Sequence, residues 1–275
     1  MCSDADKIRV DLHGAPETML ATLYGRALDA DAEHPILGDT YATEVVHRID
    51  YDWARVGITP KSAPSVVVRS AHFDGWARQF LAVHPEATVL HLGCGLDSRA
   101  LRLRPGPGVD WYDVDYPEVI ALRERFYPPD GAYRLVPASV AEVDWLTVVA
   151  ADRPALVLGE GLTMYLTKDA GLTLLRRVVE RFPSGELQFD VFDRFAIRTQ
   201  KINPTVRRAG ARLSWGIDDP AEILRDVPGT RLLAAMSVFD GSLMRRLPRR
   251  YRLAARVMAL VPALRGMQQF HRYAF

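Results

Sequence analysis

From Thr88 onward, short runs rich in β-branched and aromatic residues alternate with amphipathic stretches, and this alternation constrains the fold more than any other feature. The runs predict five strands: Thr88–Leu92, Asp110–Val114, Tyr133–Val136, Ala155–Leu158 and Glu186–Phe192. The stretches between them predict helices: Pro117–Tyr127, Val140–Ala150 and Lys168–Phe182. Strands separated by helices of this length form βαβ units, so we predict an α/β fold with a mostly parallel sheet and helices on both faces.

Two parts of the chain lie outside this alternation. Residues from Pro16 to about His84 follow a helical pattern, which predicts a helical extension over residues 1–86 in front of a sheet domain over 87–275. Near the other end, a basic amphipathic helix is expected over Leu243–Leu260, and we interpret its arginines as a solvated face rather than a nucleic-acid patch. Strands are expected on either side of that helix, the last as an antiparallel edge of the sheet: Arg231–Val238 and Gln269–Phe275.

Charge and cysteine content exclude several kinds of protein. The 35 basic and 34 acidic residues give a net charge of +1, which argues against binding nucleic acid or membrane over the whole surface. No apolar run approaches the ~20 residues that span a bilayer. Cys2 and Cys94 provide no disulfide framework, so a reducing cytoplasm is the expected location. The histidines and cysteines show no metal-ligand spacing, so no metal is expected.

The strongest local signal is an apolar strand that leads into Gly93-Cys94-Gly95 and then into a helical segment. Glycine permits a positive φ and a close approach of the backbone to a ligand, and open α/β sheets bind ligands at the carboxyl ends of their strands. The next strand ends in Asp115, at a position from which a carboxylate binds ribose hydroxyls. The pair favours an adenosine-containing ligand, with a tight structural turn and an incidental acid as the alternative. Ser98 stands where a dinucleotide-binding turn has its third glycine.

An arginine lies on the apolar face of the helix that precedes the first of these strands. Apolar side chains repeat there at helical spacing and predict a buried stripe: Val66, Phe73, Trp76, Ala77 and Phe80. Arg69 falls on the same stripe, and a buried guanidinium is costly unless an anion lies beside it. The sequence leaves two anions open: a protein carboxylate, or the carboxylate of an amino-acid-like ligand, which matches the bidentate fork of arginine.

A second acid, Glu160, follows the predicted strand Ala155–Leu158 at the ligand-binding edge of the sheet. It either lines the ligand pocket or caps the segment that follows. Tyr165, a few residues further on, is interpreted either as core packing or as a substrate contact.

Together these segments resemble the leucine carboxyl methyltransferase superfamily, and within it the bacterial branch of polyketide-type O-methyltransferases. The resemblance spans nearly the whole chain, and its matching stretches are Val68–Asp74, Leu92–Arg99, Tyr112–Val119 and Glu160–Leu166. It implies a class I methyltransferase with a Rossmann-like sheet and the cofactor S-adenosyl-L-methionine.

The resemblance also implies roles for residues of this chain. Arg69 is expected to hold the methionine carboxylate of the cofactor, and Asp115 its ribose hydroxyls. Glu160 is expected beside the cofactor, near the reaction centre. Gly93 and Gly95 are expected to line the methionyl part, and the backbone of Ser139 and Val140 to hold adenine. Cys94, between the two glycines, is also expected to contact the cofactor.

The predicted reaction is methyl transfer to an oxygen of a small, acidic molecule. A carboxylate with a pKa near ~4 is already ionised at neutral pH and needs no base, whereas a phenol or hydroxyl does, and no histidine is placed as one. A lid is expected from the amino-terminal helices and the segment Phe195–Trp215, with Arg26 or Arg198 binding the acid. Glu160 and Tyr165 are further catalytic candidates. A nicotinamide-dependent oxidoreductase and a catalytically inactive cofactor-binding protein are the alternatives.

Overall fold

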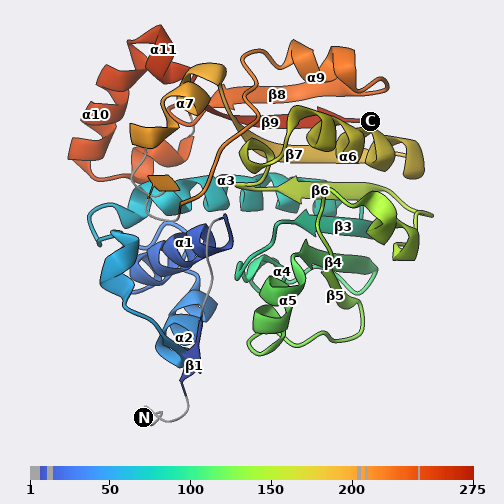
Figure 1. The fold of residues 1–275 in the computed structure, drawn as a ribbon, viewed down its shortest axis with the longest axis horizontal. Helices are drawn as coiled ribbons and strands as arrows, with labels where there is room; N and C mark the ends of the chain where they lie inside the picture. The colour runs from blue at the N-terminus through green and yellow to red at the C-terminus, as the bar shows by residue number, and fades with distance from the viewer. Residues whose placement is uncertain (1–6, 11–14, 203–205, 208–209, 241) are drawn as a thin grey trace.

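The computed structural model describes residues 7–10, 15–202, 206–207, 210–240 and 242–275 (Figure 1). Its centre is a seven-stranded sheet with the order β5-β4-β3-β6-β7-β9-β8. The strands have the following bounds: β3 Ala87–Leu92, β4 Val109–Asp115, β5 Tyr133–Pro137, β6 Ala155–Gly159, β7 Gly185–Phe192, β8 Arg231–Ser237 and β9 Gln268–Ala274. Each predicted strand is confirmed to within one residue at either end.

The first five strands of this order are parallel, and β9 runs antiparallel to both of its neighbours, β7 and β8, so that β8 has the direction of the first five. This arrangement confirms the predicted mostly parallel sheet with antiparallel pairing at its C-terminal edge. The expectation that the final strand is the edge is wrong, because β9 pairs with β7 on one side and with β8 on the other. Phe270, His271 and Tyr273 are accordingly buried, and β8 forms the edge.

Alternation of side chains along the strands separates two apolar layers. Val89 of β3 faces the helix α3 (Ala63–Val83), where it packs with Phe80. The next residue, Leu90, faces α6 (Lys168–Arg181) on the other side, where it packs with Leu175. Smaller helices complete the sheet domain: α4 Arg99–Leu103, α5 Pro117–Glu124, η4 Thr163–Tyr165 and α9 Ala221–Asp226. Helices therefore cover both faces, as a period of two in the strands requires.

The amino-terminal helices α1 (Ala15–Ala30) and α2 (Thr40–Arg48) pack together beside the carboxyl ends of the parallel strands (Figure 1). Their core includes Leu20 and Leu23 of α1, and Leu96 from the segment after β3. Three short elements belong to the same part of the chain: β1 Ile8–Arg9, β2 Ile49–Asp50 and η2 Trp53–Val56. The division between residues 1–86 and 87–275 remains a prediction.

Two predicted helices differ in the structure. The segment Val140–Ala150 contains only the 3₁₀ helix η3 (Val143–Val148), because its β-branched valines and threonine disfavour the α-helix. The predicted helix Leu243–Leu260 is divided into η6 (Ser242–Arg246) and α10 (Arg249–Ala259), because Pro248 disfavours helical backbone at the residue before it.

The other short elements lie near the C-terminal side of the sheet: α7 Arg194–Arg198, η5 Gln200–Ile202 and α11 Pro262–Arg265. Over the part of the chain that the structure describes, the helices are too short or too polar to cross a membrane.

Candidate active site

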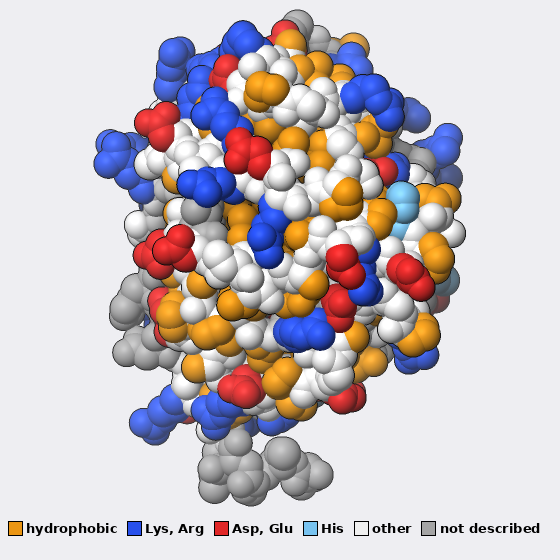
Figure 2. Space-filling view, turned by 90° about the vertical axis from the view of Figure 1, so that its right-hand side faces the viewer, with side chains coloured by type: hydrophobic (Ala, Val, Ile, Leu, Met, Phe, Trp, Pro, Cys, Tyr) orange, Lys and Arg blue, Asp and Glu red, His pale blue; other side chains and the backbone are white. Residues whose placement is uncertain are grey.

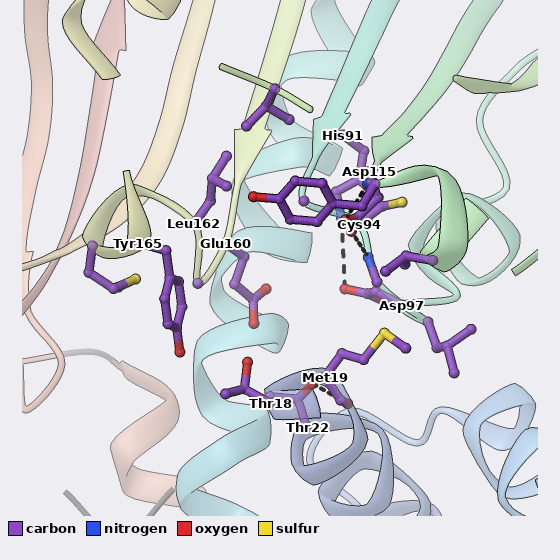
Figure 3. A pocket seen from close by; sticks show the side chains of 18 of the residues that line it. Thr18, Met19, Thr22, His91, Cys94, Asp97, Asp115, Glu160, Leu162 and Tyr165 are labelled. Atoms are coloured by element: carbon purple, nitrogen blue, oxygen red, sulfur yellow. Dashed lines mark hydrogen bonds and ion pairs between the residues drawn. The ribbon is translucent and has the colours of Figure 1, made fainter. Parts of the chain in front are cut away.

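The carboxyl ends of the parallel strands and the helix α1 enclose a pocket with a volume of about 260 Å³ (Figure 3). The pocket brings together every cofactor-contacting residue predicted from the sequence: Arg69, Gly93, Cys94, Gly95, Asp115, Ser139, Val140 and Glu160. Of the other candidates, Tyr165 and Arg26 also line it. Arg198 is exposed in α7 and is absent from the part of the lining that the structure describes.

The glycine turn after β3 forms the floor of the pocket. Gly93 and Gly95 have φ values of +62° and +50°, in the region that favours glycine. A Cβ atom at Gly93 would lie 3.1 Å from Leu162, and one at Gly95 would lie 3.1 Å from Met19 of α1. Glycine therefore allows both the bend of the backbone and the close approach of the two pocket walls.

Asp115 at the end of β4 faces this turn. Its Oδ2 accepts a hydrogen bond from the Gly95 amide at 2.7 Å, and its Oδ1 accepts one from the Tyr116 amide at 2.8 Å. Burial raises the pKa of Asp115, while these two amides act in the opposite direction. Each carboxylate oxygen has further lone pairs, so Asp115 can accept hydrogen bonds from hydroxyl groups of a ligand.

Arg69 of α3 meets two protein carboxylates, so of the two anions left open by the sequence, the protein anion is present. Its Nε donates to Glu160 Oε1 at 2.9 Å, and its Nη1 donates to Asp190 Oδ2 at 2.9 Å. A Cβ atom at Gly161 would lie 3.2 Å from Nη2, so this glycine, with φ +67°, admits the guanidinium. These contacts fix the arginine in the pocket wall, and its binding of a ligand carboxylate remains a prediction.

Glu160 accepts three hydrogen bonds, two from arginines and one from a serine. Arg69 and Ser70 donate to Oε1, and Arg99 donates to Oε2. Burial opposes ionisation, but the guanidinium groups of Arg99 and Arg69 outweigh it and lower the pKa of Glu160 to about 2. The carboxylate is therefore ionised at neutral pH and does not accept a proton there.

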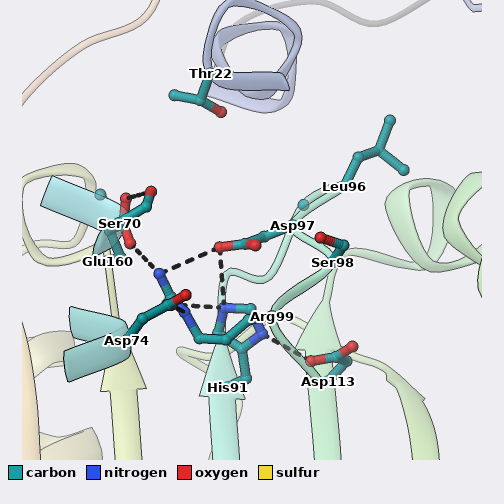
Figure 4. Close-up of polar contacts among 12 residues, drawn as sticks. Thr22, Ser70, Asp74, His91, Leu96, Asp97, Ser98, Arg99, Asp113 and Glu160 are labelled. Carbon is teal, nitrogen blue, oxygen red and sulfur yellow. Dashed lines mark hydrogen bonds and ion pairs between the residues drawn. The ribbon is translucent and has the colours of Figure 1, made fainter. Parts of the chain in front are cut away.

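A buried network of charged side chains supports the pocket from below (Figure 4). Arg99 bridges Glu160 to Asp74 of α3, with Nε 2.8 Å from Asp74 Oδ1. His91 of β3 lies beside this network and its Nδ1 is 2.8 Å from Asp113 Oδ1. Burial within a paired network makes the loss of any one partner costly, so these side chains form a rigid base.

Helix α1 forms the opposite wall through residues that the sequence did not indicate. Thr18, Met19 and Thr22 face the strand ends, as Figure 3 shows. Arg26 is buried beside them, where its Nε lies 3.2 Å from Asp39 Oδ2 and its Nη2 donates to the Leu96 carbonyl at 3.0 Å. These contacts are long-range, so no local pattern could have predicted them.

The pocket has an apolar compartment beside Glu160. Its lining comes from the ends of β6 and β7 and from the segments that follow: Leu162, Met164, Tyr165, Leu166, Phe192 and Val206. Tyr165 makes a hydrogen bond with Thr18 of α1, and burial raises the pKa of its hydroxyl. The rule that ligands bind at the carboxyl ends of strands could have found Leu162 and Phe192. Residues 203–205 and 208–209 of the predicted lid lie outside the described residues.

The sheet order and the position of the pocket at the carboxyl ends of the parallel strands define the class I methyltransferase fold. Two solved structures have this fold. A putative methyltransferase from Thermobifida fusca YX has a TM-score of 0.54 and 15% identity, over 90% of this chain and 93% of that one. A DUF574 family protein from Streptomyces avermitilis MA-4680 has a TM-score of 0.56 and 13% identity, over 91% and 96%. At these identities the likeness shows the fold alone.

The chain belongs to the leucine carboxyl methyltransferase family, whose model matches residues 19–179. It is 42% identical to the tetracenomycin polyketide synthesis O-methyltransferase TcmP of Streptomyces glaucescens, over 97% of this chain and 98% of that protein. It is 39% identical to the S-adenosyl-L-methionine-dependent methyltransferase dpfgK of Gibberella zeae, over 86% of each. The predicted family, enzyme class and cofactor are confirmed, and the nicotinamide alternative is excluded.

Proposed function

We propose that the enzyme transfers the methyl group of S-adenosyl-L-methionine to a carboxylate oxygen of a small polyketide-type molecule. Transfer to oxygen and a polyketide acceptor are supported by the similarity, over nearly the whole chain, to TcmP, an O-methyltransferase of tetracenomycin polyketide synthesis. The choice of a carboxylate is supported by the chemistry of the apolar compartment, where the described residues include no general base.

The residues of the pocket fit the cofactor. Asp115 has free lone pairs for the two ribose hydroxyls, and its raised pKa is what a buried carboxylate without a cationic partner shows. Arg69, fixed by Glu160 and Asp190, would hold the methionine carboxylate with its remaining N–H groups. The other contacts would come from the glycine turn and from the end of β5: Gly93, Cys94 and Gly95 for the methionyl part, and Ser139 and Val140 for adenine.

The absence of a base is the observation that carries this proposal. Glu160 is held ionised by Arg69 and Arg99 with a pKa of about 2, so it does not take a proton at neutral pH. The histidine among the described residues that line the pocket, His91, is buried at its base and bonded to Asp113. A phenol with a pKa near ~10 needs a base, whereas a carboxylate with a pKa near ~4 is already the nucleophile.

The mechanism then requires alignment of the acceptor. When bound, the cofactor supplies a methyl group that its sulfonium activates for direct displacement. The acceptor oxygen forms the new C–O bond as the C–S bond breaks and its electron pair stays on sulfur. Tyr165 and Thr18 would orient the acceptor carboxylate through their hydroxyls, and such positioning contributes up to about 7–11 kcal/mol. Because Arg26 is paired with Asp39, we propose that it holds α1 in place and does not bind the acidic acceptor.

The test uses radiolabelled S-adenosyl-L-methionine and a matched pair of polycyclic aromatic acceptors, one with a carboxyl group and one with a hydroxyl at the same position. Methyl esters release labelled methanol in mild alkali, and methyl ethers do not. We expect label on the acid that alkali removes. Label that resists alkali would overturn the proposal and identify a hydroxyl group as the acceptor. Binding of the cofactor without transfer to any acceptor would favour a catalytically inactive cofactor-binding protein.

A further inference from the structure

The segment from residue 243 to residue 265 concentrates positive charge. It contains seven arginines and no acidic residue, although the net charge of the whole chain is only +1. Most of it forms α10 and α11, which lie at the periphery of the molecule (Figure 1). Elsewhere the charges are mixed, and Figure 2 shows acidic and basic side chains interspersed over one face. The strongly basic segment is therefore a local feature that the methyl-transfer site does not use.

Helix α10 and the turn that follows it also expose a row of large apolar side chains. Leu253 and Val257 of the helix and Leu260 and Val261 just after it follow the spacing of one helix face, and Leu253 and Leu260 are 64% and 81% exposed. The opposite side of α10 is the one that packs on the protein, through the buried Ala255. The helix is thus already docked, and its second apolar face has no partner among the described residues. Exposed apolar patches of this kind mark binding surfaces.

Arginines run along one edge of that apolar row. Arg249, Arg252 and Arg256 are three and four residues apart, which places them on one side of the helix beside Leu253 and Leu260. Arg252 donates to the carbonyl of Arg245. Arg249 and Arg256 form no ion pair with any residue that the structure describes. Unpaired cations beside an apolar row match a surface that is both anionic and apolar.

We propose that the basic apolar face of α10 binds an anionic membrane surface, with the helix lying in the plane of the headgroups. A second copy of the chain is disfavoured because two faces without any acid would repel each other. A protein partner is disfavoured because the exposed apolar row consists of leucine and valine, which are under-represented among binding hot spots. Helices with arginines on one side and aliphatic residues on the other bind at the lipid interface without crossing it. The proposal is independent of which acceptor is methylated.

The test is co-sedimentation of the full chain with vesicles of phosphatidylcholine alone or mixed with phosphatidylglycerol. We expect binding only to the phosphatidylglycerol vesicles, weakened by added salt. The double variant R249Q/R256Q is expected to lower the partition coefficient roughly 30-fold. L253S/L260S is expected to lower it roughly ten-fold or more. Both variants should retain methyl transfer and the circular dichroism spectrum, since these side chains are exposed or outside the pocket.

Matched controls come from other exposed sites. R78Q/R177Q removes two exposed arginines from α3 and α6, and L232S/L233S removes two exposed leucines from β8. Both should bind like the wild type. The proposal is overturned if the wild type stays in the supernatant with phosphatidylglycerol vesicles, or if the controls lose as much binding as the α10 variants. A concentration-dependent dimer that L253S/L260S abolishes, without vesicle binding, would overturn it in favour of self-association.

Discussion

Two carboxylates of the pocket have pKa values that are displaced in opposite directions. Burial raises the pKa of Asp115, whose hydrogen bonds from Gly95 and Tyr116 come from neutral amides. Burial also opposes ionisation of Glu160, but Arg99 and Arg69 outweigh it and lower the pKa to about 2. The different surroundings of the two carboxylates thus suit them to different roles in the pocket. Glu160 is an anion that orients arginines, and Asp115 is an acceptor suited to neutral hydroxyl groups.

Replacement of Asp115 by alanine is therefore expected to weaken cofactor binding. Loss of hydrogen bonds to a charged group costs about 1.5–3 kcal/mol, so the Kd for S-adenosyl-L-methionine should rise roughly 10- to 150-fold. Calorimetric titration measures this change. Asp152→Ala is the control, because Asp152 is exposed at the surface beside Arg153. An unchanged Kd in Asp115→Ala would remove this carboxylate from the cofactor site.

At the scale of elements, the turn after β3 and the helix α1 meet at a single glycine. Gly95 and Gly131 have nearly the same φ, +50° and +53°, but a Cβ atom at Gly95 would lie 3.1 Å from Met19, whereas one at Gly131 would meet nothing within 4 Å. Gly131→Ala should cost only the backbone strain of about 1–2 kcal/mol and leave the KM for the cofactor unchanged. Gly95→Ala adds displacement of α1.

We expect Gly95→Ala to raise the KM for the cofactor at least about ten-fold, since displacement of a pocket wall by a fraction of an ångström disturbs aligned contacts. Denaturant unfolding of both variants gives the strain, and initial rates give the KM. Equal KM values in Gly95→Ala and Gly131→Ala would show that contact between α1 and the turn does not shape the site.

The elements also differ in how far the sequence could predict them. The strands were predictable to within one residue because short apolar runs end at turn residues. The order of the strands in the sheet could not be predicted in the same way, because β9 comes last in the chain yet lies between β7 and β8. The cofactor side of the pocket could be predicted from Gly93 and Asp115, which follow strands. A lid of amino-terminal helices was expected, but the side chains of α1 that form the wall were not predictable, because a contact such as Met19 with Gly95 depends on long-range packing.

For the whole molecule, stability is expected to depend on pH through a buried histidine of β9. His271 is fully buried, and its Nδ1 lies 2.9 Å from the Tyr273 hydroxyl. Burial lowers its pKa from 6.5 to about 4, and the charge of Asp219 offsets this only in part. Between these values the unfolded chain binds a proton that the folded chain does not. The free energy of unfolding is therefore not reduced by His271 above about pH 6.5, and it falls as the pH decreases toward 4.

The expected loss from His271 between pH 6.5 and 4 is about 2–3 kcal/mol, measured as the free energy of unfolding in urea at several pH values. His271→Gln should remove about half of the slope in this pH range, and the exposed His34→Gln should leave the slope unchanged. The pKa of His72 is also lowered from 6.5 to about 4, mainly by burial, so His72 should supply a comparable remainder. Glu160 and Asp113 do not interfere above about pH 5, because their folded pKa values of about 2 lie below their ordinary values and their stabilisation is lost only in stronger acid. A slope that persists unchanged in His271→Gln would assign the acid sensitivity to other groups.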